Sequence, residues 1–366
     1  MIAVIGSGIT GAFLAFSLAK KGCAVTVYDG HTVEYSGTSC NPGGINPFHG
    51  PAMPGIMEDF YLESYKEHLA NSDEIQKISG LDFNLKVVDR LFLAFNDDDE
   101  QGLKRMQKPY RQAQSFDARW LTSSEVAQLE SRISHNCVGG LFTTGNLSVN
   151  TQLYVAALKK SAQRLGAQFV DKNVREIHFA GEKATHVVVE NNKIPISSVA
   201  VTSGVWTAEI LKPIKPALKV RAVKGELLLV EINGPPLPLD ITYGLTGLYQ
   251  FKPGLYWAGG TQSGSLPEPG ITAAGREEIL ANLRRILPGI TKIACIEHDA
   301  GYRPMAEDSL PVVGKITPYE NIFIGTGGGS KGVLLSSGIA KTLAGLINGD
   351  SDTGLEFLSP DRFSDE

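Results

Sequence analysis

The chain has 366 residues, a length that predicts two domains. Hydrophobic residues make up 42% of the chain, which is enough for a substantial core. Its formal charge is −5, from 34 Lys and Arg against 39 Asp and Glu, so the composition gives no overall attraction to nucleic acid or to an anionic membrane. The four cysteines lack a zinc-binding pattern and no apolar run is long enough for a membrane span, so a cytoplasmic protein with free thiols is expected.

The first 29 residues follow the pattern of a dinucleotide-binding unit. Met1–Ile5 predicts a buried strand, Gly6–Gly11 a glycine-rich turn that opens a helix, and Ala24–Asp29 a second strand that ends in an acid. The chain begins directly on this strand, so no cleaved leader is expected. A tight glycine turn in an ordinary βαβ unit is the alternative, but the full order of elements favours a dinucleotide site.

Each residue of this pattern has an expected role. Gly6 permits the tight turn, Gly8 lets the backbone approach a pyrophosphate, and Gly11 lets the helix pack closely against the strand. The helix N-terminus offers unpaired N–H groups to phosphates. Asp29 lies 18 residues past Gly11, near the spacing of an acid that binds ribose hydroxyls.

Further elements alternate along the chain. Residues 36–55 predict a loop, and the acidic residues 96–100 predict a solvated turn. Helices are predicted at 56–78, 150–165, 271–286 and 331–348, a strand pair at 83–95, and strands within 167–180, 186–190, 199–202, 220–231, 248–251, 255–261 and 322–325. This interleaving predicts two discontinuous domains with a cleft between them: residues 1–80, 146–215 and 316–366 in the first, and 81–145 and 216–315 in the second.

A second glycine-rich turn, Gly325–Gly332, lies between a predicted strand and a predicted helix. Two such helix starts in one chain fit a large cofactor held at both ends, although a surface turn is the alternative. Lys331 either places a positive charge beside the N1–C2=O edge of a reduced flavin or is a solvated residue of the first helical turn; the sequence leaves both open.

A third segment runs from Gly301 to Pro304 and continues through Asp308–Gly314. Arginine suits bidentate binding of a carboxylate, and Arg303 lies in this segment. Judged from the residues alone, an arginine before a proline is more often a surface or structural residue.

Together these three segments resemble the D-amino-acid-oxidase superfamily of FAD-dependent amine oxidoreductases, nearly from end to end. Ser36–Gly44, Gly329–Val333 and Leu358–Phe363 also resemble the oxidase domain of the bifunctional tRNA wobble-uridine methylaminomethyl enzyme. The resemblance implies an α/β fold, with a Rossmann-type FAD-binding domain and a second, mainly antiparallel α+β substrate domain. It implies non-covalent FAD, because no cysteine lies in the 301–314 segment where sarcosine oxidases attach their flavin.

The resemblance also implies the site residues. Arg303 matches the arginine that binds the substrate carboxylate, and Tyr249 falls where family members present a tyrosine to the substrate. Lys331 and His49 are further catalytic candidates. The expected cofactor contacts are Gly6, Gly8, Ile9, Gly11, Asp29, Ser36, Thr38, Ser39, Asn41, Gly43, Gly44, Val174, Ser203, Gly204, Arg303, Gly328, Gly329, Ser330, Lys331 and Gly332.

The expected reaction is oxidation of the C–N bond of a small amino acid or N-substituted glycine to an imine, with hydride transfer to flavin N5 and oxygen or a quinone as electron acceptor. Two alternatives stay open. A stand-alone tRNA-modifying oxidase is favoured by the 36–44 and 329–333 segments, but the acidic balance of the chain weighs against tRNA binding. A non-catalytic flavin-binding sensor or scaffold is the other.

Overall fold

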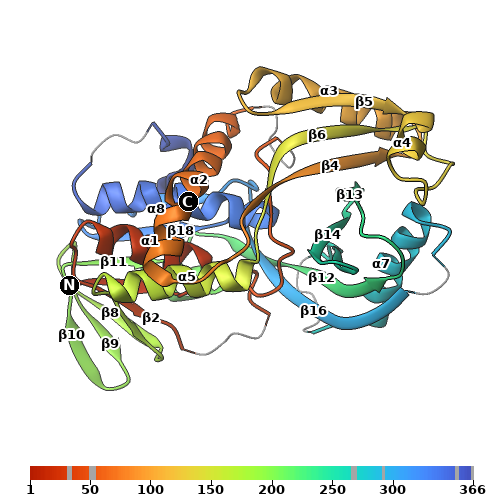
Figure 1. Cartoon of the computed structure of the whole chain (residues 1–366). Helices are drawn as coiled ribbons and strands as arrows, with labels where there is room; N and C mark the ends of the chain where they lie inside the picture. Colours follow the sequence, from red (N-terminus) through yellow and green to blue (C-terminus); the bar gives the residue numbers. More distant parts are fainter. Residues whose placement is uncertain (31–34, 49–54, 265–269, 291–292, 351–353, 364–366) are drawn as a thin grey trace.

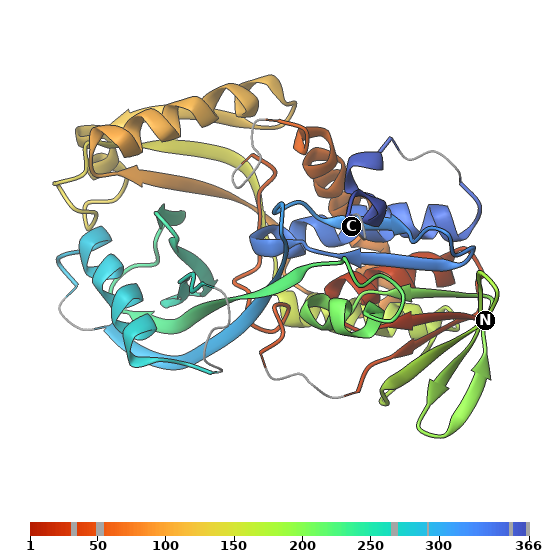
Figure 2. The same ribbon diagram turned by 180° about the vertical axis from the view of Figure 1, so that it is seen from behind.

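The computed structural model describes residues 1–30, 35–48, 55–264, 270–290, 293–350 and 354–363. Figure 1 shows two lobes side by side, each built on its own sheet, and Figure 2 shows the same division from behind. The N-terminus lies at the far edge of the first lobe, and the C-terminus lies over the same lobe, beside α8. No helix of these described ranges is both long and apolar enough to cross a membrane.

The first lobe contains a six-stranded sheet within the described residues. In spatial order its strands are β17 (Val312–Lys315), β18 (Ile322–Thr326), β11 (Ser198–Val201), β1 (Ile2–Ile5), β2 (Val25–Tyr28) and β7 (Gln168–Val170). All pairs are parallel except β17 with β18. Because β1 is central, the turn that follows it opens where the carboxyl ends of the parallel strands meet, which is where α/β folds bind ligands.

Helices cover this sheet. The helix α1 (Ile9–Lys20) is apolar on almost every side and packs against α5 (Thr151–Arg164) and α8 (Gly332–Ile347). A long helix, α2 (Glu58–Ser79), packs across α5 and α8. A small antiparallel sheet, β8 (Val174–Ala180), β9 (Lys183–Val189) and β10 (Asn192–Pro195), lies at the edge of the lobe. The short helix α6 (Thr207–Leu211) follows β11.

The second lobe contains a larger, mostly antiparallel sheet. Its spatial order is β16 (Ile293–Ala306), β12 (Val220–Ile232), β15 (Leu255–Gly259), β14 (Thr246–Lys252), β13 (Asp240–Tyr243), β4 (Lys86–Ala94), β6 (Gly139–Ser148) and β3 (Gly44–Ile45), with β5 (Asp117–Thr122) also paired to β6. The helices α3 (Asp97–Gln112), α4 (Ser123–Leu129) and α7 (Ala273–Ile286) complete the lobe, and α7 packs on β12, β14 and β15.

The predicted fold class is confirmed, while three local predictions are wrong. Residues 96–100 are not a solvated turn but the start of α3: the Asn96 side chain caps the helix by accepting from the Asp99 amide at 2.9 Å. Acids in a first turn are favoured by the helix dipole. Residues 83–95 contain one strand, β4, rather than a pair; β4 lies between β13 and β6, and its register with β6 shifts between Val88 and Arg90. The 36–55 loop includes the short strand β3, which pairs with β6.

The proposed domain ranges and the two main sheets differ at three strands. The strand β3 lies in the larger sheet although residues 1–80 are placed in the first domain. The strand β6 runs past residue 146 within the larger sheet, and β17 joins the smaller sheet although it precedes residue 316. We therefore propose that the boundaries lie near the ends of these two strands.

Candidate active site

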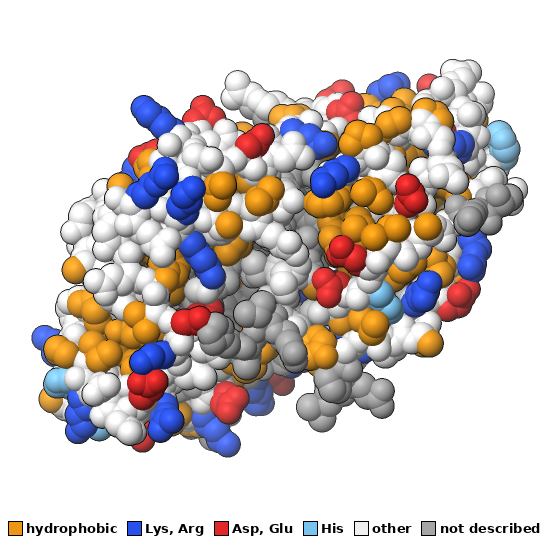
Figure 3. Space-filling view, turned by 60° about the horizontal axis from the view of Figure 1, so that its bottom comes forward, with side chains coloured by type: hydrophobic (Ala, Val, Ile, Leu, Met, Phe, Trp, Pro, Cys, Tyr) orange, Lys and Arg blue, Asp and Glu red, His pale blue; other side chains and the backbone are white. Residues whose placement is uncertain are grey.

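A cavity of about 950 Å³ lies between the two lobes and is lined by residues from both. Figure 3 shows the surface hollowed where the lobes meet. The cavity extends from the start of α1 to the start of α8 and reaches the face of the larger sheet that carries β12, β14 and β16.

At one end of the cavity, the β1–α1 turn is held by a carboxylate. The Ser7 amide donates to Asp29 Oδ2 at 2.7 Å, and the Ile9 amide donates to Thr38 Oγ1 at 3.3 Å. Gly8 is the N-cap residue of α1, and it has no side chain that could cap the helix. Gly8 and Ile9 line the cavity, so the helix start faces it. A Cβ on Gly11 would lie 1.9 Å from the Gly6 carbonyl oxygen. The helix can therefore approach the strand only with glycine at position 11.

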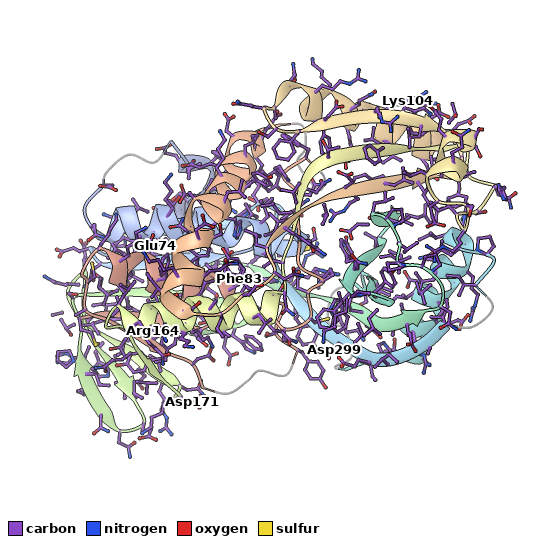
Figure 4. All side chains as sticks on the ribbon, in the orientation of Figure 1. Glu74, Phe83, Lys104, Arg164, Asp171 and Asp299 are labelled. Atoms are coloured by element: carbon purple, nitrogen blue, oxygen red, sulfur yellow. The ribbon has the colours of Figure 1, made fainter. Side chains whose placement is uncertain are left out.

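Lys159, on α5, is a lining residue that the sequence patterns did not reveal. Its Nζ donates to Ser7 Oγ at 2.7 Å. Burial lowers the pKa of the Lys159 ammonium, while the nearby charges of Asp29 and Asp171 oppose that shift. Figure 4 shows Asp171 in the first lobe, which also carries Lys159. Lys159 thus adds a cation to the end of the cavity that the first helix start faces.

The loop of residues 36–44 forms the middle of the cavity wall. The Ser39 amide donates to Ser36 Oγ at 3.1 Å, and the Gly43 amide donates to Asn41 Oδ1 at 2.8 Å. Burial, followed by the charge of Asp299, raises the pKa of the Cys40 thiol to about 12. This cysteine lines the cavity and stays protonated at neutral pH.

The other end of the cavity is the glycine-rich turn before α8. Lys331 Nζ donates to the Asn46 carbonyl at 2.7 Å. Burial, followed by the charge of Arg90, lowers the pKa of Lys331 to about 7. Of the two alternatives left open by the sequence, the structure excludes the freely solvated lysine, because this side chain is half-buried and lines the cavity.

His68 supports the start of α8 from behind. Its Nε2 lies 3.0 Å from the carbonyl oxygens of Val333 and Leu334, which can only accept, so Nε2 carries the proton. Nδ1 then accepts from the Tyr154 hydroxyl at 3.0 Å. Burial lowers the pKa of His68 to about 4, so this link between α2, α5 and α8 is neutral at physiological pH.

Arg303, on β16, extends into a slot that two glycines leave open. A Cβ on Gly225 would lie 2.2 Å from Arg303 Nη2, and one on Gly260 would lie 3.1 Å from the same atom. Arg303 Nη1 donates to the Thr261 carbonyl at 3.0 Å. No carboxylate among the described residues forms an ion pair with Arg303, and burial lowers its pKa. An arginine held by backbone alone keeps donors for an anionic ligand.

Tyr249, on β14, lies beside the same part of the cavity. Its ring edges contact the positions where Gly44 and Gly247 would carry Cβ atoms, at 3.0 and 2.4 Å. The Arg90 guanidinium carbon lies 5.0 Å from the ring centroid. Arg90 is a second lining residue that the sequence patterns did not reveal, because its role depends on strands far apart in the chain.

The cavity brings together most of the predicted residues. Two predicted cofactor contacts lie behind its wall: Gly11 packs on Gly6, and Gly43 packs on the Val149 carbonyl. His49 lies outside the described residues. The predicted residues that line the cavity are Gly6, Gly8, Ile9, Asp29, Ser36, Thr38, Ser39, Asn41, Gly44, Val174, Ser203, Gly204, Tyr249, Arg303, Gly328, Gly329, Ser330, Lys331 and Gly332.

This arrangement fits FAD. Two helix starts face one elongated cavity, where backbone N–H groups suit phosphates at one end and an electron-rich ring edge at the other. The glycines leave room for a ligand to approach the backbone, and Asp29 stands where ribose hydroxyls are bound in such folds.

Comparison with known proteins agrees with this geometry. The family model described as FAD dependent oxidoreductase (DAO) matches residues 1–346. Glycine oxidase of Bacillus licheniformis is 26% identical over 351 residues, covering 95% of this chain and 92% of that protein. The glycine oxidase structure from Geobacillus kaustophilus is 22% identical, with a TM-score of 0.90 over 100% of this chain and 98% of that one. The iminodiacetate oxidase structure from a Chelativorans species is 23% identical, with a TM-score of 0.84 over 98% and 99%. The chain therefore belongs to the DAO family of FAD-dependent oxidoreductases.

Proposed function

We propose that this enzyme oxidises the C–N bond of a small amino acid or N-substituted glycine to an imine. The observation that carries the proposal is Arg303, a largely buried guanidinium in the cavity whose described contacts include no carboxylate. A substrate carboxylate would complete its hydrogen bonding. Relatives named glycine oxidase and iminodiacetate oxidase, which act on small carboxylated amines, support the same substrate class.

Bound FAD supplies the redox chemistry by accepting a hydride. The residues of this chain would hold it at both ends: the α1 start, Ser7 and Asp29 around the adenosine and phosphate half, and the α8 start with Lys331 around the flavin half. Lys331 would place positive charge beside the N1–C2=O edge. Its hydrogen bond to the Asn46 carbonyl fixes the direction in which the ammonium points.

Substrate orientation would fall to Arg303 and Tyr249. Arg303 would bind the carboxylate with two parallel N–H donors, and the Tyr249 hydroxyl would donate to the substrate from β14 of the same sheet. Holding the α-C–H bond in one direction raises the rate, because the entropy of orienting the substrate is lost on binding and not in the reaction step. The hydride leaves with the C–H electron pair, the nitrogen lone pair forms the C=N bond, and water then hydrolyses the imine.

No side-chain base is needed in this scheme if the amine binds unprotonated. Among the described residues that line the cavity, the carboxylates are Asp29, Glu209 and Glu226. Asp29 bonds the β1–α1 turn, and Glu226 is bound by Lys224, Thr272 and His298. Neither of these two is free to remove a proton from a substrate held by Arg303.

The first experiment is an anaerobic titration of the purified protein followed by its visible spectrum. Glycine, sarcosine, iminodiacetate, D-amino acids and carboxymethylaminomethyl-modified tRNA are added in turn, with Arg303→Met as the matched control. The proposal expects a free amine to bleach the flavin of the wild type and not that of the variant. Bleaching by tRNA alone would establish the RNA-modifying alternative, whose support is the resemblance of residues 36–44 and 329–333. A flavin that no amine bleaches would favour a sensor or scaffold. Where an amine does bleach the flavin, re-oxidation of the reduced protein by air or by a quinone would identify the electron acceptor.

A further inference from the structure

Three polar residues form a row across the larger sheet. Arg90 and Asp240 are register partners on the paired strands β4 and β13. Tyr249 follows on β14, where the neighbouring amide of Gln250 donates to Asp240 Oδ1 at 3.3 Å. Directly opposed side chains on one face of a sheet contact each other, so the pairing of the strands is enough to assemble this row.

The two charged members of the row are withdrawn from solvent. Arg90 is 4% exposed and Asp240 is 3% exposed. Arg90 Nη2 lies 3.1 Å from Asp240 Oδ2. A buried ion pair of this kind is weak evidence for stability, because the desolvation of both charges offsets their attraction. The position of the ion pair is better explained by a second contact of Arg90: its guanidinium lies against the face of the Tyr249 ring.

The ring of Tyr249 is confined on three sides. Gly44 borders one edge, Gly247 borders the other, and Arg90 lies against one face, with its guanidinium carbon 5.0 Å from the centroid. A cation against an aromatic face is most favourable when the pair is desolvated, and here Arg90 is buried while Tyr249 is half-buried. The two glycines leave space for the ring but supply no attraction, so Arg90 is the group that favours this one orientation.

We propose that Arg90, oriented by Asp240, is a positioning residue that holds the Tyr249 ring against the substrate half of the cavity. The inference rests on the proposed function, in which the Tyr249 hydroxyl contacts the substrate. Arg90 borders the cavity, but its Nη2 is bound by Asp240 and its guanidinium carbon lies over the Tyr249 ring, so we assign its action to the tyrosine.

The test is a double-mutant cycle. Replacing Arg90 alone would leave Asp240 as an unpaired buried charge and threaten folding. The pair variant Arg90→Gln with Asp240→Asn keeps a neutral hydrogen-bonded pair without the cation. It is compared with Tyr249→Ala, with the triple variant and with Arg90→Lys. Arg119→Gln is the matched control, since the Arg119 guanidinium carbon also lies 5.0 Å from a ring centroid, that of Phe142, outside the cavity.

Two quantities are measured on FAD-loaded protein: kcat/KM for the amine that bleaches the flavin, and the Kd of glycolate read from the flavin spectrum. The pair variant is expected to lose about tenfold in each. Arg90→Lys, which keeps a cation under the ring, should recover part of that loss. In the Tyr249→Ala background the pair substitution should cost nothing further. A tenfold loss that persists without the tyrosine, or no loss in the pair variant, would overturn the inference.

A crystal structure of the pair variant tests the inference without any substrate. We expect the Tyr249 ring to leave its place between Gly44 and Gly247, and a ring that stays there would contradict the role of Arg90. This measurement separates the two proposals. If the wild type neither oxidises an amine nor binds glycolate, the proposed function fails, whereas the crystal structure still decides whether Arg90 positions the ring.

Discussion

At the scale of single residues, the surroundings of Arg303 decide what it can bind. Gly225 and Gly260 leave room for the guanidinium, and the Thr261 carbonyl is its one hydrogen-bond acceptor among the described residues. The sequence motif could not distinguish this site from a surface arginine before a proline. The missing signal is the pair of glycines on other strands, which become neighbours of position 303 only once β12, β15 and β16 are paired.

Substitution of Arg303 by alanine tests its role directly. We expect kcat/KM for a carboxylated amine to fall by a factor equivalent to about 2–5 kcal/mol, because the substrate carboxylate would lose its charged partner. FAD should stay bound. The check is steady-state kinetics together with the flavin absorbance per protein, and unchanged turnover would show that another group binds the carboxylate.

Replacement of Lys331 by methionine tests the charge near the flavin. The reduced cofactor would lose a stabilising cation, so its midpoint potential should become more negative, on the order of 30 mV for a tenfold effect. Because the pKa of Lys331 is about 7, the lysine is charged below that pH and neutral above it. The difference between wild type and variant should therefore be larger at pH 6 than at pH 8. Equal potentials at pH 6 would place Lys331 away from the flavin.

At the scale of elements, the glycine-rich turns show what sequence spacing can predict. The β1–α1 turn and the turn before α8 were both located from strand, glycine and helix in order, because that order has a backbone cause. Lys159 and Arg90 were not found, since each is one polar residue inside a regular element. The start of α3 was missed because its acids resemble a solvated turn until the Asn96 cap is recognised.

Gly11→Ala tests the packing of α1 on β1. The added Cβ would meet the Gly6 carbonyl oxygen, so helix and strand would have to separate. We expect a loss of about 1–3 kcal/mol in the free energy of unfolding, together with weaker FAD binding. Urea denaturation and FAD titration measure the two effects. Gly289→Ala, where a Cβ would meet open space, is the control and should change neither.

His68 makes the helix layer sensitive to acid. Its pKa is about 4 in the folded protein against an ordinary 6.5, so between these values the unfolded chain binds the extra proton. Stability therefore falls as the pH drops from 6.5 toward 4, by up to about 1.4 kcal/mol per pH unit. Urea midpoints at pH 7.5 and 5.0 should differ more for the wild type than for His68→Gln. An equal difference would mean that other groups cause the acid sensitivity.

At the scale of the whole molecule, FAD binding is expected to stabilise the folded state of both lobes together, because residues of both lobes line the cavity. Ligand binding to the folded state alone stabilises it by about 2.7 kcal/mol at a free concentration one hundred times Kd. Adding FAD to depleted protein should therefore raise Tm, as measured by calorimetry. Gly8→Val, which fills the α1 start, should abolish that shift, and a variant that keeps the full shift would contradict the placement of the phosphates.

The fold class and the division into two interleaved lobes could be predicted from the chain, because alternation of parallel-sheet units with antiparallel stretches leaves a visible pattern. The pairing order of the larger sheet could not. Nothing in the local sequence of β4 indicates that Arg90 faces Asp240, since strand register depends on contacts made across the whole lobe.

That pairing also bears on how the protein reaches its native state. Arg90 and Asp240 are separated by 150 residues, and a hydrogen-bonded link between them closes a very long loop. Contacts of high sequence separation form slowly, because the entropy of loop closure opposes them before they are stabilised by their neighbours. The link between Arg90 and Asp240 is therefore expected to form late in refolding, after strand pairs that are close in the chain, such as β14 with β15.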